Sequence, residues 1–185
     1  CWVCELPNSI ELIGGENIVV KNCQLGAQPT GITCKVQEVN KLSFINNQVY
    51  PDGRENLVLD ACNNCVIEGN NFKSYYNGIL VLNGNDNTVN KNIFWLTGAV
   101  QNQLLDHGDD FGIINVKGNN NMVASNSLSC EWAYAGAVTV NAVQGTGNVF
   151  KNCFVDNLES YRVFLVNAQT EVSNCVSSDK VSIVE

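Results

Sequence analysis

The sequence predicts an all-β protein that folds as a right-handed, single-stranded parallel β-helix, in which successive coils stack on one another. Two observations predict this fold. Similar residues return at intervals of roughly two dozen positions. The segments between them are short, rich in β-branched side chains and bounded by Gly or Asn, as strands are. Residues 1–185 are interpreted as a single β-helix domain.

A column of asparagines is the clearest sign of the repeat. Apolar residues align at spacings of 24, 23, 22, 34, 26 and 23, and five of the seven residues three positions further on are Asn. Parallel strands stack about 4.8 Å apart, so these amides are expected to hydrogen-bond from coil to coil. The apolar column is Val20, Phe44, Ile67, Val89, Val123, Val149 and Val172. The column three residues on is Cys23, Asn47, Asn70, Asn92, Asn126, Asn152 and Cys175. Two residues beyond it, a column expected to fill the interior is Leu25, Val49, Phe72, Phe94, Leu128, Phe154 and Ser177.

Each coil has two kinds of connection. One kind is tight and rich in Gly and Asn, which supply left-handed backbone conformations, and comprises residues 61–65, 83–87, 117–121 and 144–147. The other kind is long and varied and comprises residues 26–30, 50–55, 73–77, 95–111, 129–136 and 156–162. Because every coil returns to the same azimuth, we expect the long connections on one side of the solenoid, where binding usually resides.

The strands at residues 57–59, 79–82 and 113–114 are apolar in both pleat parities, whereas a strand with one face in water should alternate. Their outer face is therefore expected to be covered. A neighbouring copy is the simplest cover, which predicts a homo-oligomer, with three subunits as the favoured number. Burial beneath the chain's own long loops is the alternative.

Glu11 is the candidate catalytic residue. Ile10 and Leu12 take the inward parity, so Glu11 should point outward, onto the face expected to be apolar. Desolvation there would favour the protonated carboxyl group that a proton donor needs. A solvent-exposed glutamate in the first coil is the alternative. The residues expected in strand register with Glu11 are Val58, Leu80, Ile114 and Val140.

Two further groups of side chains are candidates for substrate binding. The insertion at 95–111 ends in the only histidine of the chain beside three carboxylates, a composition that suits sugar contacts, acid/base work, a calcium clamp or a solvated loop end. Aromatic rings near the loop bases offer flat faces to sugar rings or pack against other loops. The first group is Asp106, His107, Asp109 and Asp110, and the second is Tyr75, Tyr76, Trp95 and Trp132.

The charge balance narrows the range of partners. With a net charge of -8 and only 10 Lys and Arg residues, the chain has no basic stripe for nucleic acid or an anionic membrane. No apolar run approaches the length of a membrane span, and no signal-peptide pattern is present. The composition favours a neutral partner such as an oligo- or polysaccharide.

The chain contains nine cysteines, and because this number is odd they cannot all be paired in disulfides. Their spacing is that of core positions, and a reducing compartment is mildly favoured, although secreted and cytoplasmic locations in a bacterial-type cell both remain open. Cys1/Cys4 and Cys62/Cys65 form two C-x-x-C pairs, for which a zinc site is the less favoured interpretation. The thiols are expected to act as small buried side chains, with no metal and no cofactor.

Three segments, IELIGG (10–15), FKSYYNGILVLNGNDNTVNKNIF (72–94) and DDFGIINVKGNNNMVASNSLS (109–129), carry a family resemblance. They resemble the inulin fructotransferases, which stand with the difructose dianhydride hydrolases in glycoside hydrolase family 91. The resemblance continues to residues 163–185 at the end of the chain. Members of this family are longer, so the chain is expected to be their C-terminal portion.

The resemblance implies a pectin-lyase-like solenoid that forms a homotrimer with active sites at subunit boundaries. It also implies action on inulin-type fructans: an acid protonates the leaving oxygen while a hydroxyl of the adjacent fructose attacks the anomeric carbon, releasing a difructose dianhydride. In the hydrolase branch, water opens that dianhydride. Glu11 matches the catalytic glutamate of the family in its I-E-L context, whereas the partner aspartate would fall at or before residue 1, leaving Glu5 or an upstream residue for the second carboxylate.

Two other functions remain open. A noncatalytic β-helix that binds glycans or serves a structural role would explain the missing carboxylate. A pectate-lyase-like enzyme is disfavoured, because its acidic substrate would require basic residues and a calcium cluster on a loop face that is acidic here.

Overall fold

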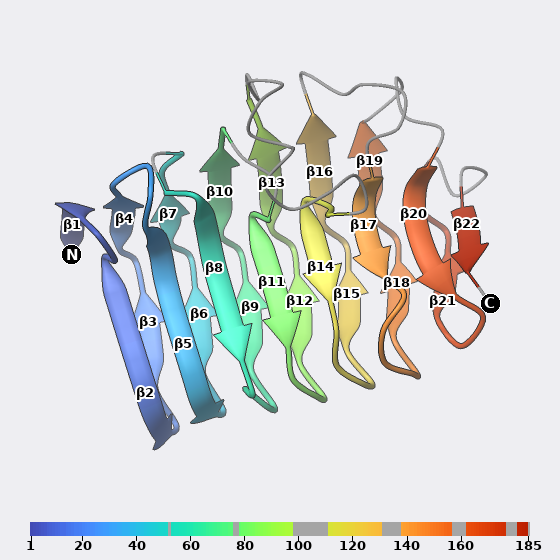
Figure 1. The fold of residues 1–185 in the computed structure, drawn as a ribbon, viewed down its shortest axis with the longest axis horizontal. Helices are drawn as coiled ribbons and strands as arrows, with labels where there is room; N and C mark the ends of the chain where they lie inside the picture. Colours follow the sequence, from blue (N-terminus) through green and yellow to red (C-terminus); the bar gives the residue numbers. More distant parts are fainter. Residues whose placement is uncertain are drawn as a thin grey trace.

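The computed structural model describes residues 1–51, 53–75, 78–97, 111–130, 138–156, 162–176 and 181–184. In these ranges every regular element is a β-strand, and the strands form three parallel sheets, which we call A, B and C (Figure 1). Sheet A contains β1 (Trp2–Leu6), β4 (Gln24–Ala27), β7 (Gln48–Val49), β10 (Asn71–Ser74), β13 (Ile93–Leu96), β16 (Ser127–Cys130) and β19 (Phe154–Asp156). Sheet B contains β2 (Ile10–Glu16), β5 (Ile32–Asn40), β8 (Glu55–Asp60), β11 (Leu80–Asn83), β14 (Ile114–Val116), β17 (Val138–Ala142), β20 (Arg162–Asn167) and β22 (Val181–Val184). Sheet C contains β3 (Val19–Lys21), β6 (Ser43–Ile45), β9 (Val66–Glu68), β12 (Thr88–Asn90), β15 (Met122–Ala124), β18 (Val149–Lys151) and β21 (Glu171–Ser173).

The chain passes through the three sheets in the same order in every coil. In Figure 1 it descends along sheet B at the front, turns, and rises behind it through sheet C and then sheet A. Each strand pairs in parallel with the equivalent strand of the next coil, as β8 does with β11 and β11 with β14. The predicted parallel β-helix is confirmed.

A row of buried asparagines joins the coils at the turn between sheets C and A. The Asn70 Nδ2 atom donates to Asn92 Oδ1 at 2.9 Å and to the Phe44 carbonyl at 2.8 Å. The Asn70 Oδ1 atom accepts from the backbone N–H and from the Nδ2 of Asn47. Asn92 repeats the pattern with Asn126, so each interior amide of the row makes all four of its hydrogen bonds.

The sixth coil corrects the predicted alignment by one residue. Val123 pairs with Phe150, not with Val149, and Leu128 pairs with Val155, not with Phe154. The residue that continues the buried row is therefore Cys153. Asn152 instead has φ 54° and occupies the left-handed position that Asn22, Asn46 and Asn174 occupy in other coils.

A second buried asparagine row lies at the tight turn between sheets B and C. Asn87 donates through Nδ2 to Asn121 Oδ1 at 3.0 Å, and Asn121 donates in the same way to Asn148 at 3.1 Å. Beside this row, glycine lets the backbones of adjacent coils lie close together, because a Cβ at Gly84 would lie 1.8 Å from the Cys62 carbonyl oxygen. The left-handed backbone conformations predicted for these turns are found at Asn64, Asp86, Asn120, Gly145 and Gly147.

The interior is filled by inward side chains of all three sheets. Phe72 stacks on Phe94 with ring centroids 5.0 Å apart and an interplanar angle of 1°, and Phe44 stacks on the other side at 6.1 Å. The long connections predicted from the sequence all join a sheet A strand to the following sheet B strand. In the described ranges no helix has the length and apolar character needed to cross a membrane.

We expect Asn92→Ala to lower the free energy of unfolding by about 3 kcal/mol, because it leaves buried donors of Asn70 and the buried carbonyl of Ile67 without partners. Asn119 makes an analogous set of contacts with Asn85 and Thr146 at an exposed position, where water can replace them. Asn119→Ala should therefore cost less than about 1 kcal/mol. Urea unfolding followed by circular dichroism measures both, and equal losses would contradict the assigned role of the buried row.

Candidate functional site

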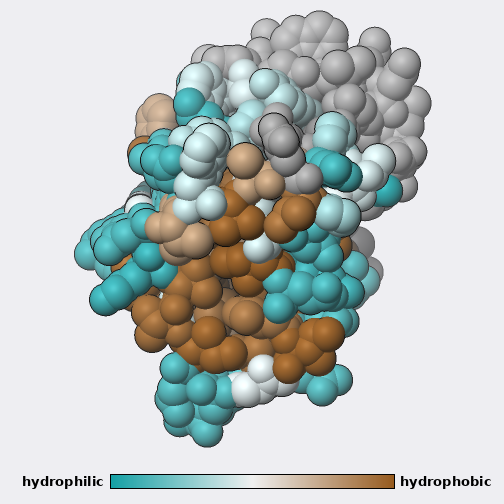
Figure 2. Space-filling view, turned by 90° about the vertical axis from the view of Figure 1, so that its left-hand side faces the viewer, coloured by the Kyte–Doolittle hydropathy of each residue, from teal (hydrophilic) through white to brown (hydrophobic). Residues whose placement is uncertain are grey.

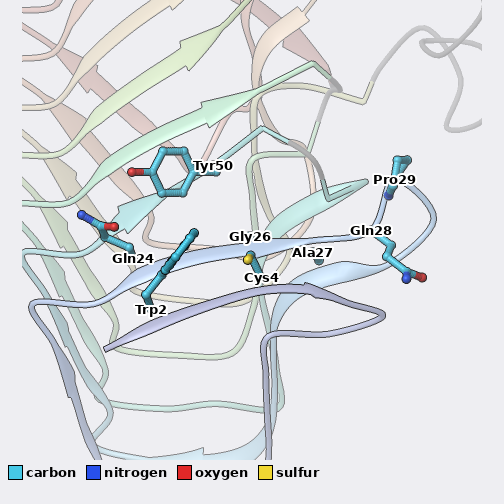
Figure 3. Close-up of a pocket in the computed structure, with 8 residues that line it drawn as sticks. All are labelled: Trp2, Cys4, Gln24, Gly26, Ala27, Gln28, Pro29 and Tyr50. Atoms are coloured by element: carbon cyan, nitrogen blue, oxygen red, sulfur yellow. The ribbon is translucent and has the colours of Figure 1, made fainter.

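A cavity of about 530 Å³ lies on the outer face of sheet A at the first coils. Figure 3 shows Trp2, Gln24 and Tyr50 at one end of this cavity and Gln28 and Pro29 at the other. The lining residues are Trp2, Cys4, Gln24, Gly26, Ala27, Gln28, Pro29 and Tyr50. None of these side chains is a carboxylate, an ammonium or a guanidinium group. The cavity therefore offers aromatic faces and neutral amides, which suit an uncharged ligand with hydroxyl groups.

Strand pairing brings the two aromatic residues of the cavity together. Trp2 is the register partner of Gln24, and Val49 is the register partner of Leu25, which points inward. Tyr50 follows Val49 and therefore has the outward parity. The Trp2 side chain is 73% exposed, so its ring is accessible from solvent.

Trp95 lies on the same outer face, further along the solenoid. It pairs with Lys73, whose Nζ atom lies 4.6 Å from the centre of the Trp95 ring. A cation at this distance from an aromatic face is attracted by the ring and helps to hold its orientation. Tyr75 follows β10 and is 42% exposed, but it does not line the cavity.

Glu11 lies in β2 on the outer face of sheet B, as its parity predicted. Its Oε1 atom is 3.2 Å from Lys35 Nζ in the adjacent strand, and the Glu11 side chain is 43% exposed. Within a single chain this carboxylate is therefore partly exposed to solvent, and the predicted cover by a neighbouring copy stays a prediction. Glu11 does not line the sheet A cavity.

The outward column that contains Glu11 also differs from the predicted one. Its members after Glu11 are Lys35, Val58, Val81, Asn115, Asn141 and Leu165. Leu80, Ile114 and Val140 instead lie in the inward column with Ile10. The face is thus mixed rather than uniformly apolar. Ile79 and Ile113, which directly precede β11 and β14, are buried within the chain itself.

Several predicted site residues lie outside the described ranges. They are Tyr76, Asp106, His107, Asp109, Asp110 and Trp132, together with the side chain of Glu5. Conversely, the prediction missed Trp2, Gln24 and Tyr50. The sequence feature that could have identified them is their position, because each has the outward parity next to an inward apolar residue of sheet A.

The cysteines of the described ranges behave mainly as buried side chains. Desolvation raises the pKa of the Cys62 thiol and raises that of Cys65 to about 11. Both donate to backbone carbonyl oxygens, Cys62 to Asp60 and Cys65 to Asn63. The buried thiols of Cys153 and Cys175 form a hydrogen bond that shifts their pKa values in opposite directions. It lowers the pKa of Cys175 to about 7 and raises the pKa of Cys153.

Three parallel sheets, in each of which the strands of successive coils lie side by side, define a parallel β-helix protein. Residues 3–170 match the model of the family described as periplasmic copper-binding protein (NosD), and the chain belongs to this family. In the part of the chain that the structure describes, no three His, Cys, Asp or Glu side chains come together in a group that could hold a metal ion. These residues therefore do not fit a copper site.

Solved structures of DFA-IIIase from Arthrobacter chlorophenolicus A6 share this fold. The complex with GF2 has a TM-score of 0.79 at 21% identity and covers 100% of this chain and 49% of that chain. The complex with DFA-III has a TM-score of 0.78 at 20% identity, covering 100% and 51%. The form without its lid has a TM-score of 0.72 at 18% identity, covering 97% and 53%.

The chain thus spans about half the length of these solved structures. At this level of identity the likeness shows the fold, and it confirms at that level the resemblance to the inulin fructotransferases drawn from the sequence. A comparison with curated proteins gave no match.

We expect iodoacetamide to modify the exposed Cys1 of the native protein and to leave Cys34, Cys62 and Cys65 unmodified until urea unfolds it. Burial raises the pKa of these three thiols, and the thiolate is the reactive form. Mass spectrometry of the peptides locates the modified residues. Rapid modification of Cys62 and Cys65 in the native state would show that they form an accessible C-x-x-C pair instead.

Proposed function

We propose that this chain is the C-terminal half of a fructan-active enzyme of the inulin fructotransferase type, which releases a difructose dianhydride from inulin by intramolecular fructosyl transfer. The observation that carries the proposal is the structural match to DFA-IIIase over the whole chain, with a TM-score of 0.79. Structures of that protein hold GF2 and DFA-III. The neutral, partly aromatic lining of the sheet A cavity suits a ligand of the same kind.

In the proposed reaction Glu11 is the proton donor. Its carboxyl proton passes to the glycosidic oxygen, the bond from that oxygen to the anomeric carbon breaks, and a hydroxyl oxygen of the adjacent fructose bonds to the same carbon. The hydroxyl proton passes to a second carboxylate, as glycosyl transfer ordinarily requires. The Lys35 Nζ atom lies 3.2 Å from the Glu11 Oε1 atom, in the adjacent strand. Glu5 or a residue of a preceding coil is the proposed second carboxylate.

The preceding coils themselves are part of the proposal. Figure 2 shows a broad apolar surface at the end of the solenoid that carries the first coil. Leu6, Ile13 and Val19 are exposed in the first coil, beside the partly buried Ile10 and Leu12. We propose that further β-coils of a longer chain stack on this surface, since an open end of a solenoid core is otherwise unprotected.

We propose a homotrimer in which the outer face of sheet B meets a neighbouring copy. This face carries a shallow cavity of about 210 Å³ lined by Val58 and Val81 between polar groups such as Lys35, Asp60 and Lys117. A partner seated there would exclude water from the neighbourhood of Glu11. The proposed partners are thus a neutral fructan and two further copies of the chain.

Two alternatives use the same surfaces. A difructose dianhydride hydrolase would admit water to the anomeric carbon in place of the hydroxyl. A noncatalytic glycan-binding protein is favoured by one observation: the cavity on sheet A offers a neutral aromatic site that does not include Glu11.

We expect Glu11→Gln to lower the rate of dianhydride release from inulin by at least about a hundredfold, because an amide cannot donate the proton that the leaving oxygen needs. Glu16→Gln is the matched control. Glu16 lies in the same strand, is exposed, and pairs with Lys41 at 2.8 Å, as Glu11 pairs with Lys35. Its rate should stay within about twofold of the wild-type rate. Liquid chromatography of the products after incubation with inulin measures both rates.

The same assay separates the alternatives. Opening of added difructose dianhydride without formation of dianhydride from inulin would support the hydrolase. No turnover of either substrate by the full-length protein, with inulin binding retained in Glu11→Gln, would support the noncatalytic protein and overturn the enzyme proposal.

A further inference from the structure

We propose that the outer face of sheet A is an anchoring site for an inulin chain, separate from Glu11, in which the rings of Trp2 and Tyr50 stack on sugar units. This inference rests on the proposed function for the class of saccharide. It goes beyond that function in assigning a second binding surface to the same chain.

The lining of the cavity specifies the chemistry of the ligand. Trp2 and Tyr50 provide flat apolar faces at one end of the cavity, and the amide of Gln24 lies beside them (Figure 3). A sugar unit has apolar C–H faces and a rim of hydroxyl groups, which match stacking on a ring and hydrogen bonding to an amide. Among the described residues that line the cavity no side chain is ionised, so the cavity itself favours an uncharged sugar unit.

The parallel register extends this surface along the solenoid. Tyr50 has the outward parity in the third coil, and Lys73 and Trp95 are paired on the same face in the next two. Adjacent strands lie about 4.8 Å apart, so Tyr50 and Trp95 are separated by about 10 Å along the axis. Two rings at this spacing can contact different units of one chain. Lys73, held over the Trp95 ring, adds N–H donors for hydroxyl groups between them.

The site is distinct from the proposed catalytic carboxylate. Glu11 lies on sheet B, and its ion-pair partner Lys35 belongs to that sheet as well. Neither residue lines the sheet A cavity. Binding at Trp2 and Tyr50 therefore holds the polymer without occupying the position of the reacting bond. A long inulin molecule gains more affinity from this contact than a short one.

Isothermal titration calorimetry with long-chain inulin in the Glu11→Gln background tests this, because the expected slow turnover of that variant then disturbs the titration little. We expect Trp2→Ala and Tyr50→Ala each to raise the Kd for inulin about tenfold, and Trp95→Ala to raise it by a smaller factor. Met122→Ala is the control: Met122 is 36% exposed in β15 of sheet C, away from the outer face of sheet A, and does not line the cavity, so the Kd of this variant should be unchanged. Thermal unfolding by circular dichroism checks that each variant is folded.

An unchanged Kd in folded Trp2→Ala and Tyr50→Ala overturns the anchoring site, and so does the absence of inulin binding. The outcome is separable from that of the proposed function. The protein with Glu11 intact can release the dianhydride with a KM for inulin that Trp2→Ala does not alter. That result would contradict the anchoring site and leave the proposed enzyme standing. Inulin binding that depends on Trp2 and Tyr50, without turnover in any variant, would support the anchoring site. It would contradict only the proposed enzyme.

Discussion

The hydrogen bonds between buried asparagines of successive coils fix the register on which the rest of this structure depends. Each interior amide, such as that of Asn70, is satisfied on all four of its hydrogen-bonding positions only when the coils above and below are aligned. A slip of one residue would bury unpaired amides and also turn the inward side chains outward. The row therefore specifies one alignment, and every outward column on sheets A and B inherits it.

Cysteine takes the place of asparagine where these rows change or end. Cys153 follows Asn126, and its thiol contacts the Val123 carbonyl oxygen at 3.7 Å, as the Asn126 amide contacts Val89. In the second row Cys65 occupies the position before Asn87, whose Oδ1 atom accepts the Cys65 N–H. A thiol is small, tolerates burial and has one weak donor, so it fits a position where an amide would lack its next partner. This placement explains why Cys65 and Cys153 are buried residues of the two rows.

The coils could be predicted from the sequence because their period repeats in two chemically different columns. The predicted alignment of the sixth coil was wrong by one residue, for a physical reason. The turn between sheets C and A has two neighbouring positions that both favour Asn: one with a left-handed backbone and one in the buried row. Asn46 and Asn47 fill both. In the sixth coil only Asn152 is present, and the adjacent apolar pair Val149 and Phe150 fits either alignment. Only the packing of the coils decides between them.

The site was harder to predict than the fold because it depends on which parity faces outward. The segment 79–82 is apolar at every position, so its sequence does not reveal that Val81, rather than Leu80, shares a column with Glu11. Trp2 and Tyr50 are 48 positions apart and come together only through the register of the first three coils. A sequence pattern that identifies repeats therefore does not by itself identify the pair of rings that forms a cavity.

The exposure of Glu11 sets a condition on the proposed chemistry. Transfer to a hydroxyl of the same fructan, rather than to water, requires that water be kept from the anomeric carbon while the leaving oxygen is protonated. The outer face of sheet B in a single chain does not meet this condition, since the Glu11 side chain is 43% exposed and its lysine partner is open to solvent as well. In the proposed enzyme the cover would come from coils that stack on the apolar first coil or from a second copy against sheet B. The choice between transfer and hydrolysis would then be made by what covers Glu11, and not by Glu11 itself.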